Sequence, residues 1–152
     1  IDDKFCYLHL VTDAFSRMVI GYVLAPTLEA KYTIEALQQA ISHAGSGNLC
    51  GTIHHSDRGV QYCCDEYITL LKEHHIRISM TEDSNPTDNG MAERVNGIIK
   101  NEFLEPLQTP KNLLEALPLV DHAVRTYNTL RPHLNLNMRT PAQVYEGKQI
   151  IL

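Results

Sequence analysis

Two acidic residues, Asp57 and Glu93, occupy positions where a carboxylate can take part in chemistry. Asp57 comes where the strand predicted over 51–55 ends, and α/β sheets present their functional groups at strand ends. Glu93 comes one turn into a predicted helix, and 35 residues lie between the two carboxylates. Carboxylate oxygens suit hard divalent cations, so both residues are candidate metal ligands and candidate catalytic residues.

The helix that carries Glu93 also carries a candidate phosphate contact. Gly97 and Lys100 follow Glu93 at intervals of four and seven residues, which places all three on one helix face. The apolar residues of the opposite face are expected to be buried: Met91, Val95, Ile98 and Phe103. The helix could therefore present Glu93 to a metal ion and Lys100 to a phosphate.

Four strands are expected to position these residues. Apolar runs and alternation predict them at 5–12, 18–25, 51–55 and 76–80. The first two are joined by a short polar connection at 13–17 and should form an antiparallel hairpin. Helices separate the later strands, which should therefore run parallel. The fold class is α/β, a mixed sheet with flanking helices.

Helical periodicity predicts the remaining elements. It covers Ile34–Ala44, 63–75, Met91–Phe103 and a long segment beyond Pro106. A loop rich in turn-forming residues, 82–90, precedes the helix of Glu93.

Caps and prolines predict where the last helices begin. Thr109 and Pro110 should open the long helix as its cap and first residue, and Pro118 should kink or split it. Thr140 and Gln143 form a predicted capping box for a final short helix.

Composition limits the class of protein. A chain of 152 residues suffices for one domain with a core, and 43% hydrophobic and 20% charged residues are ordinary for a globular protein. No apolar run has the length of a membrane span, so no membrane association is expected. The four cysteines lack the spacing of a disulfide framework, which favours thiols in a reducing cytoplasm. The net charge of −5 opposes DNA binding unless appended domains supply cations.

Three doublets of potential zinc ligands have a simpler interpretation. They are His54–His55, Cys63–Cys64 and His74–His75, and they match none of the usual finger spacings. Adjacent residues on a strand point to opposite faces, so His54 and His55 cannot easily bind one ion. A structural zinc site is not expected.

Four ordered motifs resemble those of insertion-sequence transposases, which share their core with retroviral integrases. They span almost the whole chain: the hairpin Asp13-Ala14-Phe15-Ser16-Arg17 with Gly21, the segment His55–Tyr62, the segment Asn85–Glu93, and Tyr127-Asn128-x-x-Arg131-Pro132-His133 followed by Thr140-Pro141-x-x-Val144-Tyr145. In the second and third motifs, Asp57 and Glu93 match two of the family's catalytic carboxylates at its characteristic interval. One motif would be weak, whereas four in order are specific.

The resemblance implies an RNase H-like fold in which two aspartates and one glutamate hold two divalent metals, Mg²⁺ or Mn²⁺. It implies phosphoryl transfer that cleaves and joins DNA during integration, with DNA as substrate and a homo-oligomer as the working form. Two metals suit this reaction, because they activate the attacking hydroxyl and stabilise the leaving oxygen.

The first aspartate of that triad has no match in the sequence. Asp3 runs directly into the strand at 5–12, which leaves no room for an earlier strand and turn. Asp13 aligns with an aspartate at the hairpin end, outside the triad. We therefore expect the first strand and its aspartate to fall before residue 1, so that 1–152 is a single catalytic-core domain truncated on its N-terminal side. By itself this chain should be inactive.

Other interpretations remain open for each residue and for the chain. Asp57 could cap a turn, since Asp-Arg-Gly is turn chemistry, and Glu93 and Lys100 could be solvated helix residues. The chain could be a non-catalytic DNA-docking or assembly domain, or another RNase H-like nuclease. The residues upstream of residue 1 would distinguish these alternatives.

Overall fold

The structure is a computed structural model, and it describes residues 6–45, 49–57, 59–80, 90–105 and 110–147. The part of the predicted loop that covers 82–89 lies outside these residues, as do Asp3, Arg58 and Thr109. The order of strands and helices is the one predicted from the sequence, and the α/β class is confirmed.

An antiparallel hairpin forms the middle of the molecule. It consists of β1 (Tyr7–Thr12) and β2 (Val19–Ala25), whose register shifts between Val11 and Thr12. The turn between them is closed by Asp13, whose carboxylate accepts hydrogen bonds from the backbone N–H and the hydroxyl of buried Ser16. This places the end of β1 and the start of β2 in a fixed geometry.

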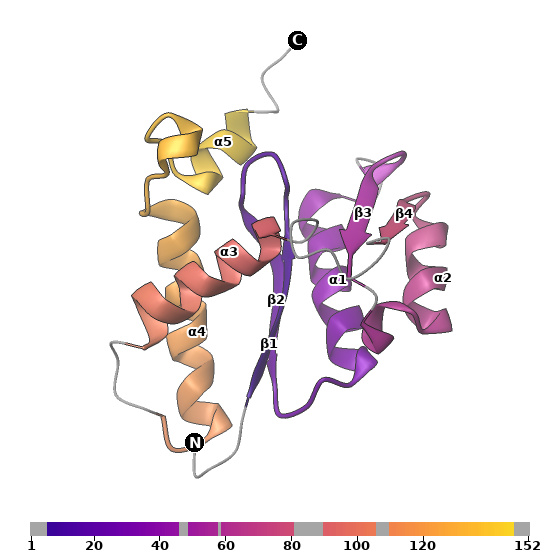
Figure 1. The fold of residues 1–152 in the computed structure, drawn as a ribbon, viewed down its shortest axis with the longest axis horizontal. Helices are drawn as coiled ribbons and strands as arrows, with labels where there is room; N and C mark the ends of the chain where they lie inside the picture. Colours follow the sequence, from indigo (N-terminus) through magenta and orange to yellow (C-terminus); the bar gives the residue numbers. More distant parts are fainter. Residues whose placement is uncertain (1–5, 46–48, 58, 81–89, 106–109, 148–152) are drawn as a thin grey trace.

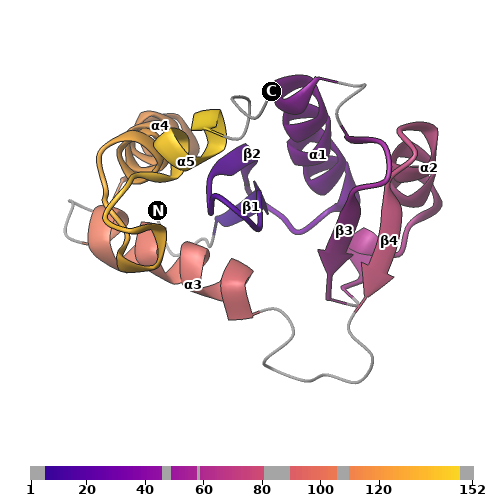
Figure 2. The same cartoon turned by 90° about the horizontal axis from the view of Figure 1, so that it is seen from above.

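A second pair of strands lies beside the hairpin. β3 (Ile53–Ser56) and β4 (Arg77–Met80) are parallel and are connected through a 3₁₀ turn, Val60–Tyr62, and helix α2 (Asp65–Glu73). Antiparallel and parallel pairing are therefore both present, as predicted. In the described part of the chain they form two separate two-stranded sheets, because β1 and β3 do not pair with each other (Figure 2).

Helix α1 (Ala30–Ala44) packs against the hairpin and against α2. Leu37 and Ile41 join Tyr67, Leu71 and Ile76 in one buried cluster. The helix is followed by Gly45, whose positive φ of 78° is a backbone conformation that glycine adopts without steric cost.

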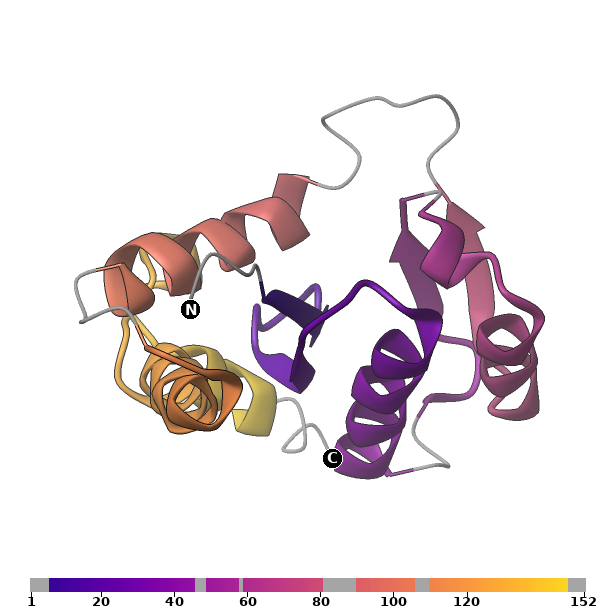
Figure 3. The same cartoon turned by 90° about the horizontal axis from the view of Figure 1, so that it is seen from below.

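The remaining helices cover the other side of the hairpin (Figures 1 and 3). They are α3 (Gly90–Ile98), which continues as a π-helical segment (Ile99–Leu104), α4 (Leu113–Thr129), a 3₁₀ turn (Leu134–Leu136) and α5 (Pro141–Gly147). A second buried cluster joins β2, α3 and α4 through Val19, Val95, Ile99, Val120, Ala123, Val124 and Tyr127. The hairpin is thus held between two cores.

The predicted start of α4 is wrong. The helix begins at Leu113, not at Pro110, because Asn112 accepts a hydrogen bond from the N–H of Glu115 while the Glu115 carboxylate accepts one from the N–H of Lys111. The helix continues through Pro118, so the proline does not split it, and the alternative of a kink stays a prediction. Its missing hydrogen bond is offset by buried residues on both sides of it, such as Ala116 and Val120. The capping box of Thr140 and Gln143 is confirmed, with reciprocal bonds of 3.0 and 3.3 Å.

Gly21 is required where β2 meets α1. A Cβ atom at this position would collide with the backbone oxygen of Ala36 and lie 2.9 Å from the backbone nitrogen of Ala40. We expect Gly21→Ala to lower the free energy of unfolding by about 1–3 kcal/mol, because neither backbone atom can yield without moving the helix. Urea denaturation measures this loss.

Gly97→Ala is the matched control. Gly97 lies inside α3, and nothing stands within 4 Å of the position where its Cβ would be. Alanine there should stabilise the protein by about 0.5–1 kcal/mol, because it lowers the entropy lost on helix formation. Equal urea midpoints for the two variants would contradict the close packing of β2 on α1.

Candidate active site

Asp57 directly follows β3, as predicted, and its side chain is exposed. Its carboxylate accepts a hydrogen bond of 2.9 Å from the backbone N–H of Gly59, so the aspartate also closes the turn that follows the strand. The turn chemistry considered as an alternative is therefore present. It is compatible with a role in metal binding, because a carboxylate has further lone pairs for a cation.

A group of rings lies under β3 and supports the strand that leads to Asp57. The Tyr67 hydroxyl is hydrogen-bonded to Nε2 of His54 at 2.9 Å, and the rings of Tyr62 and Tyr67 meet edge to face at 5.5 Å. Burial lowers the pKa of His54 to about 4. Burial also raises the pKa of Tyr62, and the nearby charge of Asp57 adds to that shift. The segment is thus held by neutral, packed side chains.

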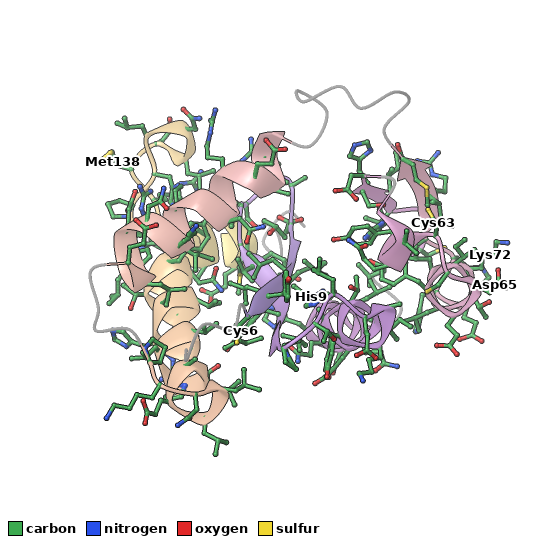
Figure 4. The ribbon with its side chains drawn as sticks, turned by 60° about the horizontal axis from the view of Figure 1, so that its bottom comes forward. Cys6, His9, Cys63, Asp65, Lys72 and Met138 are labelled. Carbon is green, nitrogen blue, oxygen red and sulfur yellow. The ribbon has the colours of Figure 1, made fainter. Side chains whose placement is uncertain are left out.

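The predicted alternation of His54 and His55 is confirmed. His54 faces the tyrosines, whereas His55 is exposed and hydrogen-bonded to the Ser79 hydroxyl at 3.0 Å. The structure describes all four cysteines and joins none of them in a disulfide, and Figure 4 shows Cys6 at the hairpin and Cys63 beside α2, far from each other.

Glu93 lies in the first turn of α3 and is exposed, while Val95 of the same helix is buried. Lys100 is exposed as well, in the π-helical segment, and its ammonium group lies 4.0 Å from the carboxylate of Glu105. At 72% and 58% exposure of the two side chains, this ion pair contributes little to stability, so Lys100 remains available for an anionic ligand.

A cavity of about 280 Å³ connects the parts of the candidate site. Its wall consists of the end of β1 on one side, β3 with Asp57 on the other, α1 beneath, and the residues Met91 and Ala92 at the start of α3. Asp57 and the residues just before Glu93 therefore border the same space. Asp13 borders it too, at the end of the hairpin.

The ligands within the described residues fit a hard divalent cation in kind but fall short in number. Asp57 and Glu93 supply carboxylate oxygens, the donors that such cations prefer. No group of three or more histidine, cysteine, aspartate or glutamate side chains able to hold a metal occurs in the part of the chain that the structure describes.

Sequence patterns did not predict two polar groups of this cavity. The Ser56 hydroxyl and Nδ1 of His54 are buried without a hydrogen-bond partner among the described residues, and both side chains line the cavity wall. Such groups are costly unless something satisfies them. The alternation of β3 gives the only sequence signal, since it turns His54 and Ser56 to the same face.

The fold is that of retroviral integrase catalytic cores, an RNase H-like class. The catalytic core of HTLV-2 integrase in complex with magnesium, in its trimeric form, matches 95% of this chain and 87% of its own length, with a TM-score of 0.73 and 28% identity. The intasome of simian T-cell lymphotropic virus contains a chain that matches 99% of this one with a TM-score of 0.80. Its identity is 22%, it is covered over 51% of its length, and it supports the fold alone.

The sequence also matches the integrase core domain over residues 1–86 and again over 74–141. The transposase of insertion sequence IS629 from Shigella sonnei is 30% identical over 139 residues, which are 91% of this chain and 46% of that protein. The transposase of IS3A from Escherichia coli K12 is 30% identical over 149 residues, 98% of this chain and 51% of that protein.

The chain belongs to the integrase core domain family, in the form carried by insertion-sequence transposases, and the resemblance to that family is confirmed. It spans about half the length of the curated relatives described above. None of its described helices is long and apolar enough to cross a membrane.

The buried imidazole of His54 predicts a pH dependence of stability. Its pKa is about 4 in the folded protein and 6.5 when unfolded, so between these values the unfolded chain binds more protons. The stability that depends on an uncharged His54 is therefore fully present above about pH 6.5, and it is lost as the pH falls toward about 4. In His54→Gln, the decrease in urea midpoint between about pH 7.5 and about pH 5 should be smaller than in the unmodified chain.

His55→Gln is the control for this measurement, since the exposed neighbour lies on the other face of β3. It should keep the full pH dependence. An equal pH dependence in the unmodified chain and in His54→Gln would show that His54 does not carry the effect.

Proposed function

We propose that the chain is the catalytic core of a transposase that cleaves and joins DNA strands by two-metal phosphoryl transfer. The single observation that supports this most is the cavity, which Asp57 borders from β3 and the start of the Glu93 helix borders from the other side. Because the chain belongs to the integrase core domain family, we interpret Asp57 and Glu93 as a pair that acts together in catalysis.

In this proposal Asp57 and Glu93 hold divalent metal through their carboxylates, and the ions are Mg²⁺ or Mn²⁺. When bound, the metal ions activate the attacking hydroxyl and neutralise charge on the leaving oxygen. The chain itself has to orient the carboxylates. The Asx turn fixes Asp57, and the buried Val95 fixes the face of α3 from which Glu93 projects. The attacking group is water or a DNA 3′-hydroxyl, not a side chain of the protein.

The third carboxylate would enter with a strand that fills the cavity. β1 and β3 border the cavity from opposite sides, and each pairs with only one neighbour among the described residues. Strand edges need partners for their N–H and C=O groups, and the buried hydroxyl of Ser56 needs one too. We assign this strand, and the first aspartate, to a segment upstream of residue 1, so that it completes a single domain with residues 1–152.

DNA is the proposed substrate, and Lys100 is the proposed phosphate contact on the same helix as Glu93. The net charge of −5 requires that basic segments outside these residues supply most of the attraction to DNA.

A homo-oligomer is the proposed working form. The related HTLV-2 integrase cores are described in trimeric and dimeric forms.

A non-catalytic docking or assembly domain is the second candidate function. It is favoured by the lack of a third metal ligand within the described residues. A plain nuclease of the same fold is the third. Cleavage without joining would identify the nuclease, and DNA binding with neither reaction would identify the docking domain.

The decisive experiment uses a version of the protein extended upstream. Asp57→Asn and Glu93→Gln should each abolish joining of a labelled element-end oligonucleotide to plasmid in Mn²⁺, while folding and DNA binding persist. Both changes are nearly isosteric but remove the negative charge that the metal needs. Asp65→Asn and Glu73→Gln are matched controls, because both carboxylates are exposed on α2, where Figure 4 shows Asp65 on the outer surface. Robust joining by Glu93→Gln, or by residues 1–152 alone, would refute the assignment.

Metal binding by residues 1–152 should be weak. Affinity follows the number and charge of the ligands, so two carboxylates should give a dissociation constant for Mn²⁺ on the order of 10⁻⁴–10⁻³ M. The upstream extension should tighten it, and Asp57→Asn should weaken it in both forms. Isothermal calorimetry measures these constants. Low-micromolar binding by residues 1–152 that survives Asp57→Asn would place the metal elsewhere.

A further inference from the structure

The motif at the end of α4, Tyr127 to His133, connects three separate elements, and the proposed chemistry assigns it no part. Tyr127 is fully buried and donates a hydrogen bond of 3.0 Å from its hydroxyl to the backbone oxygen of Arg17. Arg17 has a φ of 66°, a left-handed conformation that non-glycine residues rarely adopt. The tyrosine thus holds a strained position in the turn that ends the hairpin.

Asn128 fixes the same end of the hairpin through its amide. Its oxygen accepts from the N–H of Val19 at 3.0 Å, and its nitrogen donates to the carbonyl of Val19 at 2.9 Å. The Asn128 side chain thus satisfies the backbone N–H and C=O of Val19 in β2, as a neighbouring strand would. Because the amide is buried, α4 is held in one position relative to β2.

Arg131 extends this attachment to the helix of Glu93. Its guanidinium donates two hydrogen bonds of 2.6 Å to the two carboxylate oxygens of Glu102, and they hold the pKa of that carboxyl below its ordinary value. His133 lies 3.3 Å from the guanidinium and meets the ring of Tyr127 edge to face at 5.1 Å. A forked pair of this kind fixes direction as well as distance.

Glu102 belongs to the π-helical segment that continues α3. There the N–H of Glu105 donates to the carbonyl of Lys100, five residues earlier. Leu104 packs against the same cluster as Ile99, also five residues away. π-Helical turns are rare and are frequently found at functional sites. Conversion to α-helix would shift the register by one residue, which moves the preceding helix by about 1.5 Å along its axis and about 100° around it.

We propose that Arg131 and Glu102 are positioning residues for Glu93. Their ion pair keeps the π-helical segment in register, and Tyr127 and Asn128 fix Arg131 relative to the end of the hairpin that borders the Asp57 cavity. The distance between Glu93 and Asp57 is thereby set from the far end of α3. This inference deepens the proposed function and rests on it for the role of Glu93.

The ion pair should contribute little to folding stability, so its effect on the position of α3 can be measured separately. The Arg131 side chain is 25% exposed and that of Glu102 is 46% exposed, so water screens the attraction between them. Removing the pair should therefore leave most of the folding stability intact. A displacement of 1 Å at a catalytic group, in contrast, can lower a rate about 100-fold.

Pulsed electron paramagnetic resonance tests the geometry without reference to activity. Spin labels replace exposed Val60, near Asp57, and exposed Arg94, beside Glu93, in residues 1–152 with their four cysteines changed to serine. Glu102→Gln should broaden or shift the distance distribution, and the reversed pair Glu102→Arg with Arg131→Glu should restore it. A control pair at positions 60 and 72, both on the α2 side of the molecule, should not change.

Joining by the extended protein gives the second measurement. Glu102→Gln should reduce joining per folded molecule by about 10- to 100-fold with unchanged DNA binding, and the reversed pair should recover most of it. An unchanged distance distribution in Glu102→Gln, or a loss of joining that merely follows the unfolded fraction, would overturn the positioning role. If instead Glu93→Gln joins DNA normally, the proposed function fails while the distance measurement still decides whether the pair positions α3.

Discussion

The unpaired edges of β1 and β3 are the constraint on which the rest of this structure depends. Each strand has one partner among the described residues, and the two border one cavity from opposite sides. Backbone groups along a buried edge have to be satisfied, and a strand does this better than water, because it also covers apolar side chains. The buried, unpartnered hydroxyl of Ser56 makes the same demand. If a further strand lies between β1 and β3, as we propose, the cavity and the separation of the two sheets have one physical origin.

Local chemistry predicted most of the fold. The predicted end of the strand placed Asp57 directly after β3. Alternation turned His54 and His55 to opposite faces, because a strand has a period of two. Thr140 and Gln143 form the predicted capping box, since each needs only a partner three residues away. The start of α4 was mispredicted because two capping sequences lie close together, and the geometry of Asn112 and Glu115 outweighs the pattern at Thr109 and Pro110.

The candidate site was predictable in kind and not in arrangement. The interval between Asp57 and Glu93 makes these two carboxylates a candidate pair, which stays a prediction, but it carries no information on the cavity between their elements. The attachment of Tyr127 and Asn128 to the hairpin joins residues more than 100 positions apart, for which a single sequence has no local signal. The π-helical segment also has no local signal in the sequence. Its register depends on a partner, Arg131, that belongs to another part of the chain.

The net negative charge, which by itself opposes DNA binding, would favour the binding of cations at this site. Asp13 and Asp57 border the cavity, and Glu93 comes directly after the lining residues Met91 and Ala92, so the border of the cavity carries negative charge. Negative charge of this kind repels DNA and attracts divalent cations. In the proposed reaction two divalent ions bring four positive charges, which nearly cancel the net charge of −5. Under the proposed function, attraction of a DNA phosphate to this cavity would therefore depend on metal binding, because the cations offset the negative charge of the carboxylates.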